Sequence, residues 1–174
     1  RFAVGGDGGW DYVSVDCEAR RLFVPRGSHV LVLDADTGKQ VGDLQDTAGV
    51  HGAIIAPGSG CGFTSNGRAD SITVFDSKTF AAKKTIPGGK NPDALVYEPT
   101  TKCVYVGNGR SKDVTVIDVA RLEVVATIPV GGKYSGAATS KWNGMDAKAW
   151  EAEMKKQGYV RFADDGTNFR AGID

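Results

Sequence analysis

The sequence lacks an excess of charge of either sign, and it lacks long apolar runs. Its 174 residues carry 21 Lys+Arg against 21 Asp+Glu, so no basic field is present to attract nucleic acid or an anionic membrane surface. No apolar stretch approaches the roughly 20 residues that a membrane-spanning helix needs. We therefore expect no nucleic-acid partner and no membrane span. With 41% hydrophobic residues, the chain can bury one ordinary core.

Cysteine is also scarce. The three residues, Cys17, Cys61 and Cys103, form an odd set without CxxC spacing, which argues against a structural zinc site or a disulfide framework. We expect them to act as small, half-buried hydrophobic residues in strands and turns. The chain begins at Arg1, without an initiator Met or a signal-peptide pattern, and we expect a mature or trimmed product or part of a longer chain.

Catalytic signatures are absent from the sequence. It has no GxSxG elbow, phosphate-binding P-loop, HExxH pair or paired-glycine dinucleotide fingerprint. We expect the 24 glycines to serve in turns between strands and not as a phosphate cradle. The sequence therefore favours a protein without catalytic activity over an enzyme, and it identifies no cofactor.

What the sequence does have is an internal repeat. The runs VLVLD, ITVFD and VTVID end 42 residues apart, at Asp34, Asp76 and Asp118. Ten residues after each Asp, an apolar residue closes a further short run, at Leu44, Ile86 and Ile128. Each Asp is also preceded by two apolar runs, one containing Phe23, Phe63 or Tyr105 and one beginning at Asp11, His51 or Asp93.

Each repeat thus contains four short strands in about 40 residues, with glycine-rich or aspartate-rich turns between them. No apolar stripe of 3.6-residue period runs through the repeats, which excludes a helical repeat. Strands of this kind are buried on both faces only when sheet packs on sheet. The predicted fold is all-β, a β-propeller of four-stranded antiparallel blades.

The predicted organisation has an outer strand at 1–6 and blades at 7–45, 47–87 and 91–129, within a propeller region of 1–133. Residues 134–174 depart from the repeat, with a predicted helix at 146–157 and a predicted hairpin at 159–174. This tail is either a degenerate fourth blade that the N-terminal strand completes, or part of an open three-blade arc. In the open arc, the tail or a second copy of the chain covers the exposed end faces.

Three quartets carry a family resemblance: YVGN at 105–108, FTSN at 63–66 and FVPR at 23–26. They resemble the Tyr-Val-Thr-Asn signature of the YVTN-repeat β-propellers, and the VxVID and TIPVGG elements also match that pattern. The sequence departs from the signature because Pro, Ser or Gly replaces its Thr, and Arg26 replaces its Asn in the first blade. The resemblance implies an exported bacterial protein, periplasmic or extracellular, that binds a ligand or a protein, and it implies no reaction.

Antiparallel pairing predicts one polar rim, because the innermost strand of a blade starts beside the end of the second strand. The candidate ligand-binding residues on this rim are Asp11, His51, Asp93, Arg26, Asn66 and Asn108. Arg68 and Arg110 end two NGR tripeptides and could form an anion-binding pair. We expect the NGR runs to be tight turns in which Asn or Gly takes positive φ. The residues Asp34, Asp76 and Asp118 are predicted to cap turns.

Three functions stay open on this basis. The first is a non-catalytic ligand-binding or protein-interaction scaffold that acts through the polar rim. The second is a metal-assisted hydrolase or lactonase-type propeller, with Asp11, His51 and Asp93 as metal ligands or base. The third is an accessory subunit that docks onto a larger complex through its tail, where Trp142 and Trp150 lie. The sequence names no ligand and no metal.

Overall fold

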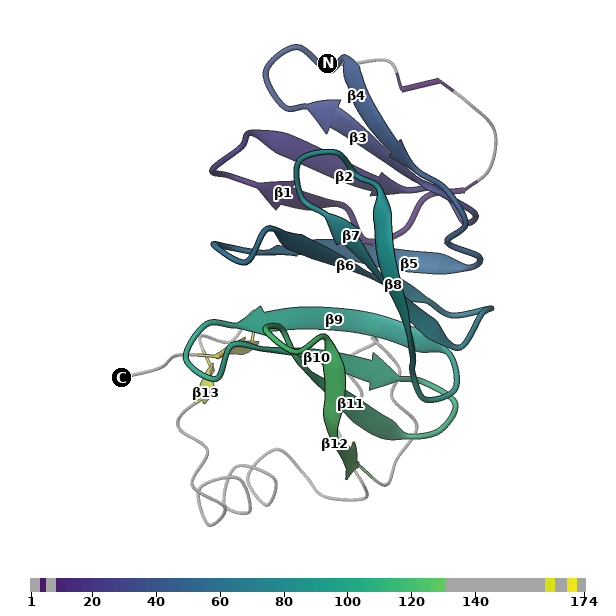
Figure 1. Cartoon of the computed structure of the whole chain (residues 1–174), viewed down its shortest axis with the longest axis vertical. Coiled ribbons are helices and arrows are strands. Elements are labelled where there is room, and N and C mark those ends of the chain that lie inside the picture. The colour runs from purple at the N-terminus through teal and green to yellow at the C-terminus, as the bar shows by residue number, and fades with distance from the viewer. Residues whose placement is uncertain (1–3, 6–8, 131–161, 165–168, 172–174) are drawn as a thin grey trace. The chain divides into compact units, whose positions relative to one another are not determined.

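The first unit of the protein is built from three antiparallel β-sheets of four strands each (Figure 1). The computed structural model describes residues 4–5, 9–130, 162–164 and 169–171. The chain divides into two compact units, Arg1–Tyr134 and Ser135–Asp174. The described part contains no helix, and hence none that could cross a membrane. The predicted all-β propeller fold is confirmed in three blades, which do not close into a ring.

Strand order within each sheet follows the chain, so each blade is a meander. The strands of the three blades are β1 Ser14–Asp16, β2 Arg21–Pro25, β3 Val30–Asp34 and β4 Gln40–Leu44; β5 Val50–Ala56, β6 Cys61–Asn66, β7 Ser71–Asp76 and β8 Ala82–Pro87; and β9 Pro92–Glu98, β10 Cys103–Asn108, β11 Asp113–Asp118 and β12 Glu123–Pro129. In the second unit, β13 Phe162–Asp164 pairs antiparallel with β14 Phe169–Ala171, in the segment expected to form a hairpin. The helix expected at 146–157 lies outside the described residues, as does the outer strand expected at 1–6 apart from Val4 and Gly5.

The third and fourth strands of every blade are joined in the same way. Their pairing shifts register after Val32, Val74 and Val116, which are 42 residues apart. The connecting turn places Gly38, Phe80 and Leu122 at positive φ, although this conformation is uncommon for Phe and Leu. The N–H of each donates to the carbonyl of the strand-ending Asp at 2.8–2.9 Å, which fixes a closed turn at this point of each repeat.

The strand-ending aspartates cap these turns, as predicted. Asp34 Oδ1 accepts hydrogen bonds from the backbone N–H groups of Asp36 and Thr37 at 3.1 and 2.7 Å. Asp76 Oδ1 accepts those of the equivalent Lys78 and Thr79, both at 2.9 Å. The repeated carboxylate therefore satisfies N–H groups that the turn leaves free.

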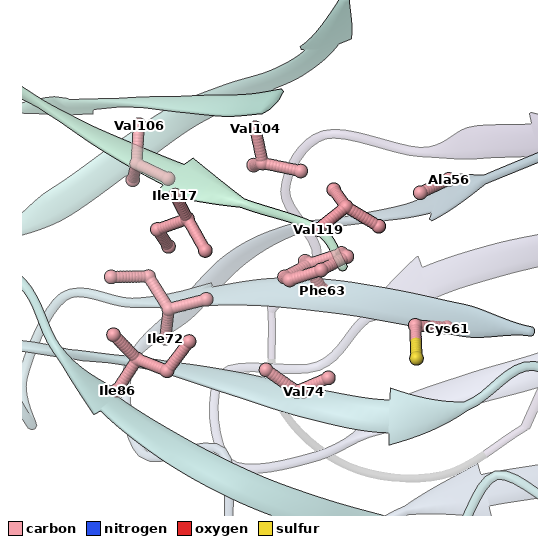
Figure 2. Close-up of a cluster of buried hydrophobic side chains, with 10 residues drawn as sticks. All are labelled: Ala56, Cys61, Phe63, Ile72, Val74, Ile86, Val104, Val106, Ile117 and Val119. Carbon is pink, nitrogen blue, oxygen red and sulfur yellow. The ribbon is translucent and has the colours of Figure 1, made fainter. Parts of the chain in front are cut away.

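Apolar side chains between neighbouring blades form the core. Phe23, Val30 and Val32 of the first blade pack with Phe75 of the second, and the rings of Phe23 and Phe75 lie 5.9 Å apart between centroids. A second cluster joins the second and third blades, and Figure 2 shows Phe63 and Ile72 among the side chains that gather there with Ile117. Successive side chains of a strand point to opposite faces of its sheet. The second blade therefore contributes apolar side chains to both clusters, one on each of its buried faces.

The innermost strand of the first blade is shorter than predicted. The sequence favoured a strand from Asp11, but β1 begins at Ser14, opposite Phe23. Continued pairing would bring the chain to Pro25, which has no N–H to donate. The N–H of Tyr12 instead donates to the carbonyl of His51 in the second blade at 3.0 Å. The segment before β1 is therefore attached to the neighbouring blade.

Candidate functional site at the polar rim

The turns at one end of the three blades surround a hollow of about 420 Å³, which we call the rim hollow. Backbone hydrogen bonds tie these turns together, from Gly49 N–H to the Gly27 carbonyl at 2.6 Å and from Gly67 N–H to the Gly49 carbonyl at 2.9 Å. The lining comes from all three blades: Gly9, Trp10, Asp11 and Gly27 from the first, Gly49, Val50, His51, Gly67, Arg68 and Asp70 from the second, and Asn91 and Arg110 from the third.

A histidine and an aspartate from different blades meet in the rim hollow. His51 Nδ1 lies 2.8 Å from Asp11 Oδ2, and both side chains are partly exposed. His51 is held by β5, while Asp11 lies in the segment that the Tyr12 backbone bond attaches to the second blade. The contact fixes the imidazole through one nitrogen and joins two residues that the sequence placed on the same rim.

The glycine of the first NGR run is needed for close packing. A methyl group added at Gly67 would lie 2.5 Å from His51 Nε2 and 2.9 Å from Asn91 Oδ1. The expectation of positive φ at the Asn and Gly of these runs is wrong, because neither adopts it in either run. Positive φ falls instead at Asp70 and Lys112, at the last position of each turn. Gly67 thus lets the imidazole and an amide approach the backbone.

Asp93 is a half-buried carboxyl near this pair. Its Oδ1 is buried and has no hydrogen-bond partner among the described residues. Burial raises the pKa of Asp93, and the nearby charge of Asp11 raises it further, while His51 opposes the shift. Asp93 does not line the rim hollow.

The geometry does not assemble a metal centre from the candidate residues. Across the described ranges of the chain, no group of three or more His, Cys, Asp or Glu side chains is placed to hold a metal ion. Asp11, His51 and Asp93 therefore approach one another without forming a ligand set.

The two candidate asparagines lie beside the rim through their backbones only. Asn66 pairs with Val50, and Asn108 pairs with Pro92, as the antiparallel logic predicted. Their side chains are buried, at 1% and 0% exposure. Asn66 Nδ2 donates to Thr73 Oγ1 at 2.8 Å, and Asn108 Nδ2 makes the equivalent bond to Thr115 Oγ1, also at 2.8 Å. Asn66 and Asn108 thus stabilise their blades from within, and neither lines the hollow.

Arg26, the first-blade counterpart of these asparagines, lies elsewhere. It lines a separate hollow of about 360 Å³ together with His29, Leu31 and Leu33. The backbone N–H of Arg26 donates to the His29 carbonyl at 2.8 Å and closes the turn between β2 and β3. Arg26 does not line the rim hollow.

Arg68 and Arg110 both line the rim hollow. Three further polar or aromatic residues that the sequence did not predict line it as well: Trp10, Asp70 and Asn91. Trp10 is 76% exposed and directly precedes Asp11. Asp70 binds Lys90 Nζ at 2.7 Å and the Asn91 N–H at 2.8 Å, and these contacts, Lys90 first, hold its pKa below the ordinary value. The available signal was that each of the three lies within two residues of a predicted site residue, Asp11, Arg68 or Asp93.

Comparisons with known proteins support the fold and leave the function open. No protein-family model and no curated protein matches the chain. Among solved structures, the chain is similar to hydrazine synthase of Kuenenia stuttgartiensis, with a TM-score of 0.65 and 24% identity over 72% of this chain and 37% of that one. It is also similar to U3-55K, with a TM-score of 0.65 and 14% identity over 72% of this chain and 41% of that one. The chain therefore spans about two fifths of these structures.

Proposed function

We propose that this protein is a non-catalytic binding module whose ligand or partner occupies the rim hollow. The observation that carries the proposal is that segments of all three blades line one hollow of about 420 Å³ with polar and aromatic side chains. Concave sites that combine an aromatic surface with a few converging polar groups are typical of ligand recognition. The resemblance to YVTN-repeat propellers supports a periplasmic or extracellular location for the module.

The competing functions have less support. A metal-assisted hydrolase would need a ligand set, and the described residues offer no group of three suitable side chains. Docking through the tail would depend on Trp142 and Trp150, which lie outside the described residues. The rim hollow, in contrast, is lined by side chains of described residues that a ligand could contact.

A thermal-shift screen with a chemically diverse set of small molecules tests the proposal. We expect some compounds to raise the melting temperature of the wild type, because a ligand that binds only the folded state stabilises it. The shift should be lost in Trp10→Ala, which removes the exposed ring of the hollow, and retained in Val124→Ala, which trims an exposed apolar residue of β12. The proposal fails if no compound shifts the wild type, or if the shifts persist in Trp10→Ala.

A further inference from the structure

The charged side chains that line the rim hollow differ in whether they have hydrogen-bond partners. Its two carboxylates already have partners, since Asp11 binds His51 and Asp70 binds Lys90. The two guanidinium groups are less engaged: within the described part of the chain, Arg68 and Arg110 make no side-chain hydrogen bond and no ion pair, although both are exposed and line the hollow. Arg110 is near enough to Asp70 for its charge to help lower the pKa of that carboxyl. The charged donors of this lining that lack a hydrogen-bond partner among the described residues are therefore guanidinium groups.

The position of the two arginines follows from the repeat. Arg68 and Arg110 lie 42 residues apart, each two residues after a buried asparagine that braces its blade. The Arg110 N–H is held by the Lys90 carbonyl at 3.0 Å, and the Arg68 backbone packs against Gly49, where an added methyl group would lie 2.5 Å from the Arg68 nitrogen. Both backbones are thus fixed at the edge of one hollow, while the side chains keep their donors available.

The rest of the lining suits a small ligand with an apolar part. Glycines from the first and second blades, Gly27, Gly49 and Gly67, leave backbone as part of the surface, and the Trp10 ring is 76% exposed. Guanidinium groups donate in pairs to the oxygens of carboxylates and phosphates, and an exposed indole offers a face to a planar group. We infer that the rim hollow binds an organic oxyanion, a carboxylate or phosphate monoester with a planar apolar substituent, through Arg68 and Arg110. This inference rests on the proposed function of the same hollow.

Calorimetric titration with benzoate, phenyl phosphate and uncharged benzyl alcohol, at constant ionic strength set with sodium chloride, tests the inference. We expect the wild type to bind at least one of the two anions, and to bind it more tightly than benzyl alcohol. The comparison of benzoate with phenyl phosphate identifies which oxyanion is preferred. Arg68→Gln and Arg110→Gln should each weaken anion binding roughly tenfold, since each removes charge-assisted hydrogen bonds.

Arg121→Gln is the matched control. Arg121 is similarly exposed, but it lies in the turn at the opposite end of β11, where it pairs with Asp118, so anion affinity should not change. Melting temperatures of the three variants report whether each is folded. If Arg68→Gln and Arg110→Gln bind the anion as the wild type does, or if benzyl alcohol binds equally well, the oxyanion inference is wrong, while Trp10-dependent ligands would still support the proposed function. If the compound screen also yields no ligand, both are wrong.

Discussion

Asn66 and Asn108 occupy equivalent positions, but only one of them has its side-chain oxygen satisfied. Thr64 Oγ1 donates to Asn66 Oδ1 at 2.8 Å. The equivalent residue in the third blade is Val106, and Asn108 Oδ1 is buried without a hydrogen-bond partner among the described residues. An unsatisfied buried acceptor lowers stability. The third blade lacks the hydroxyl donor that Thr64 supplies in the second blade.

Val106→Thr should therefore be tolerated at a buried position where a hydroxyl group is normally unfavourable. Its hydroxyl replaces a methyl group of similar size and can donate to Asn108 Oδ1, so we expect the free energy of unfolding to be unchanged or higher. Val104→Thr places the same hydroxyl on the same strand face, also at 0% exposure, within the apolar cluster. We expect it to lower the free energy of unfolding by about 1–3 kcal/mol. Chemical denaturation of both variants measures the difference, and equal losses would contradict the prediction.

For the two asparagines, the sequence predicted the position of the backbone but not the direction of the side chain. Sequence spacing correctly placed their backbones beside the start of the innermost strands, because antiparallel pairing fixes which residues are opposite each other. It could not tell whether the amides face the hollow or the blade interior. The direction of each amide depends on which face of the strand its residue occupies and on a hydrogen bond to Thr73 or Thr115 in the adjacent strand. These threonines can be identified as neighbours of the asparagines only when the strand register is known.

At the scale of the element, the turn between the third and fourth strands depends on its aspartate. Lys83 Nζ lies 2.8 Å from Asp76 Oδ2, and the N–H groups of Thr79 and Lys78 donate to the other oxygen. The lysine contact first, and then these hydrogen bonds, hold the pKa of Asp76 well below its ordinary value. The carboxylate thus binds protons less readily in the folded protein than in the unfolded chain.

Asp76→Asn should lower the melting temperature by several degrees at pH 7. A depressed folded-state pKa stabilises the fold above the unfolded-state value of about 4 and loses this effect as the pH falls through the folded-state pKa. The difference in melting temperature between the wild type and Asp76→Asn should therefore become smaller below about pH 4. Thermal melts from pH 7 to pH 2 measure it. Asp43→Asn, at an exposed position of β4, is the control, and its melting temperature should follow that of the wild type at every pH. A difference between wild type and Asp76→Asn that does not depend on pH would contradict the linkage.

Element prediction succeeded where the signal was local and failed where it required a partner. The apolar runs before Asp34, Asp76 and Asp118 specified their strands, because period and turn residues act over a few positions. The shortened β1 was missed, since its limit is set by Pro25 in the adjacent strand and by the bond from Tyr12 to the second blade.

At the scale of the first unit, stability is distributed unequally between blades. The second blade has an apolar cluster on each face, and in β6 and β7 every residue except Asp76 is buried. In the outer strand β12, every residue is exposed. Where each repeat packs only on its neighbours, local opening is easiest at the least buried element.

Hydrogen exchange should follow this order. We expect the amides of β6 and β7 to exchange slowest, because both strands are paired on two sides and lie within the most buried blade. Amides of β12 should exchange at least about a hundredfold faster. Exchange measured by mass spectrometry on peptides that cover each strand checks the order, and equal protection of β7 and β12 would show that the unit opens as a whole.

The register shift after Val32, Val74 and Val116 recurs every 42 residues and marks the same point in each blade. If a segment of one full period is cut out or copied in, the front half of one blade joins the back half of another, and every inward side chain keeps its face. A segment one residue longer or shorter turns the following strand over and directs its apolar residues to water. A gain or loss of 42 residues that begins and ends at this point therefore changes the number of blades and leaves the buried and exposed faces of each strand as they were.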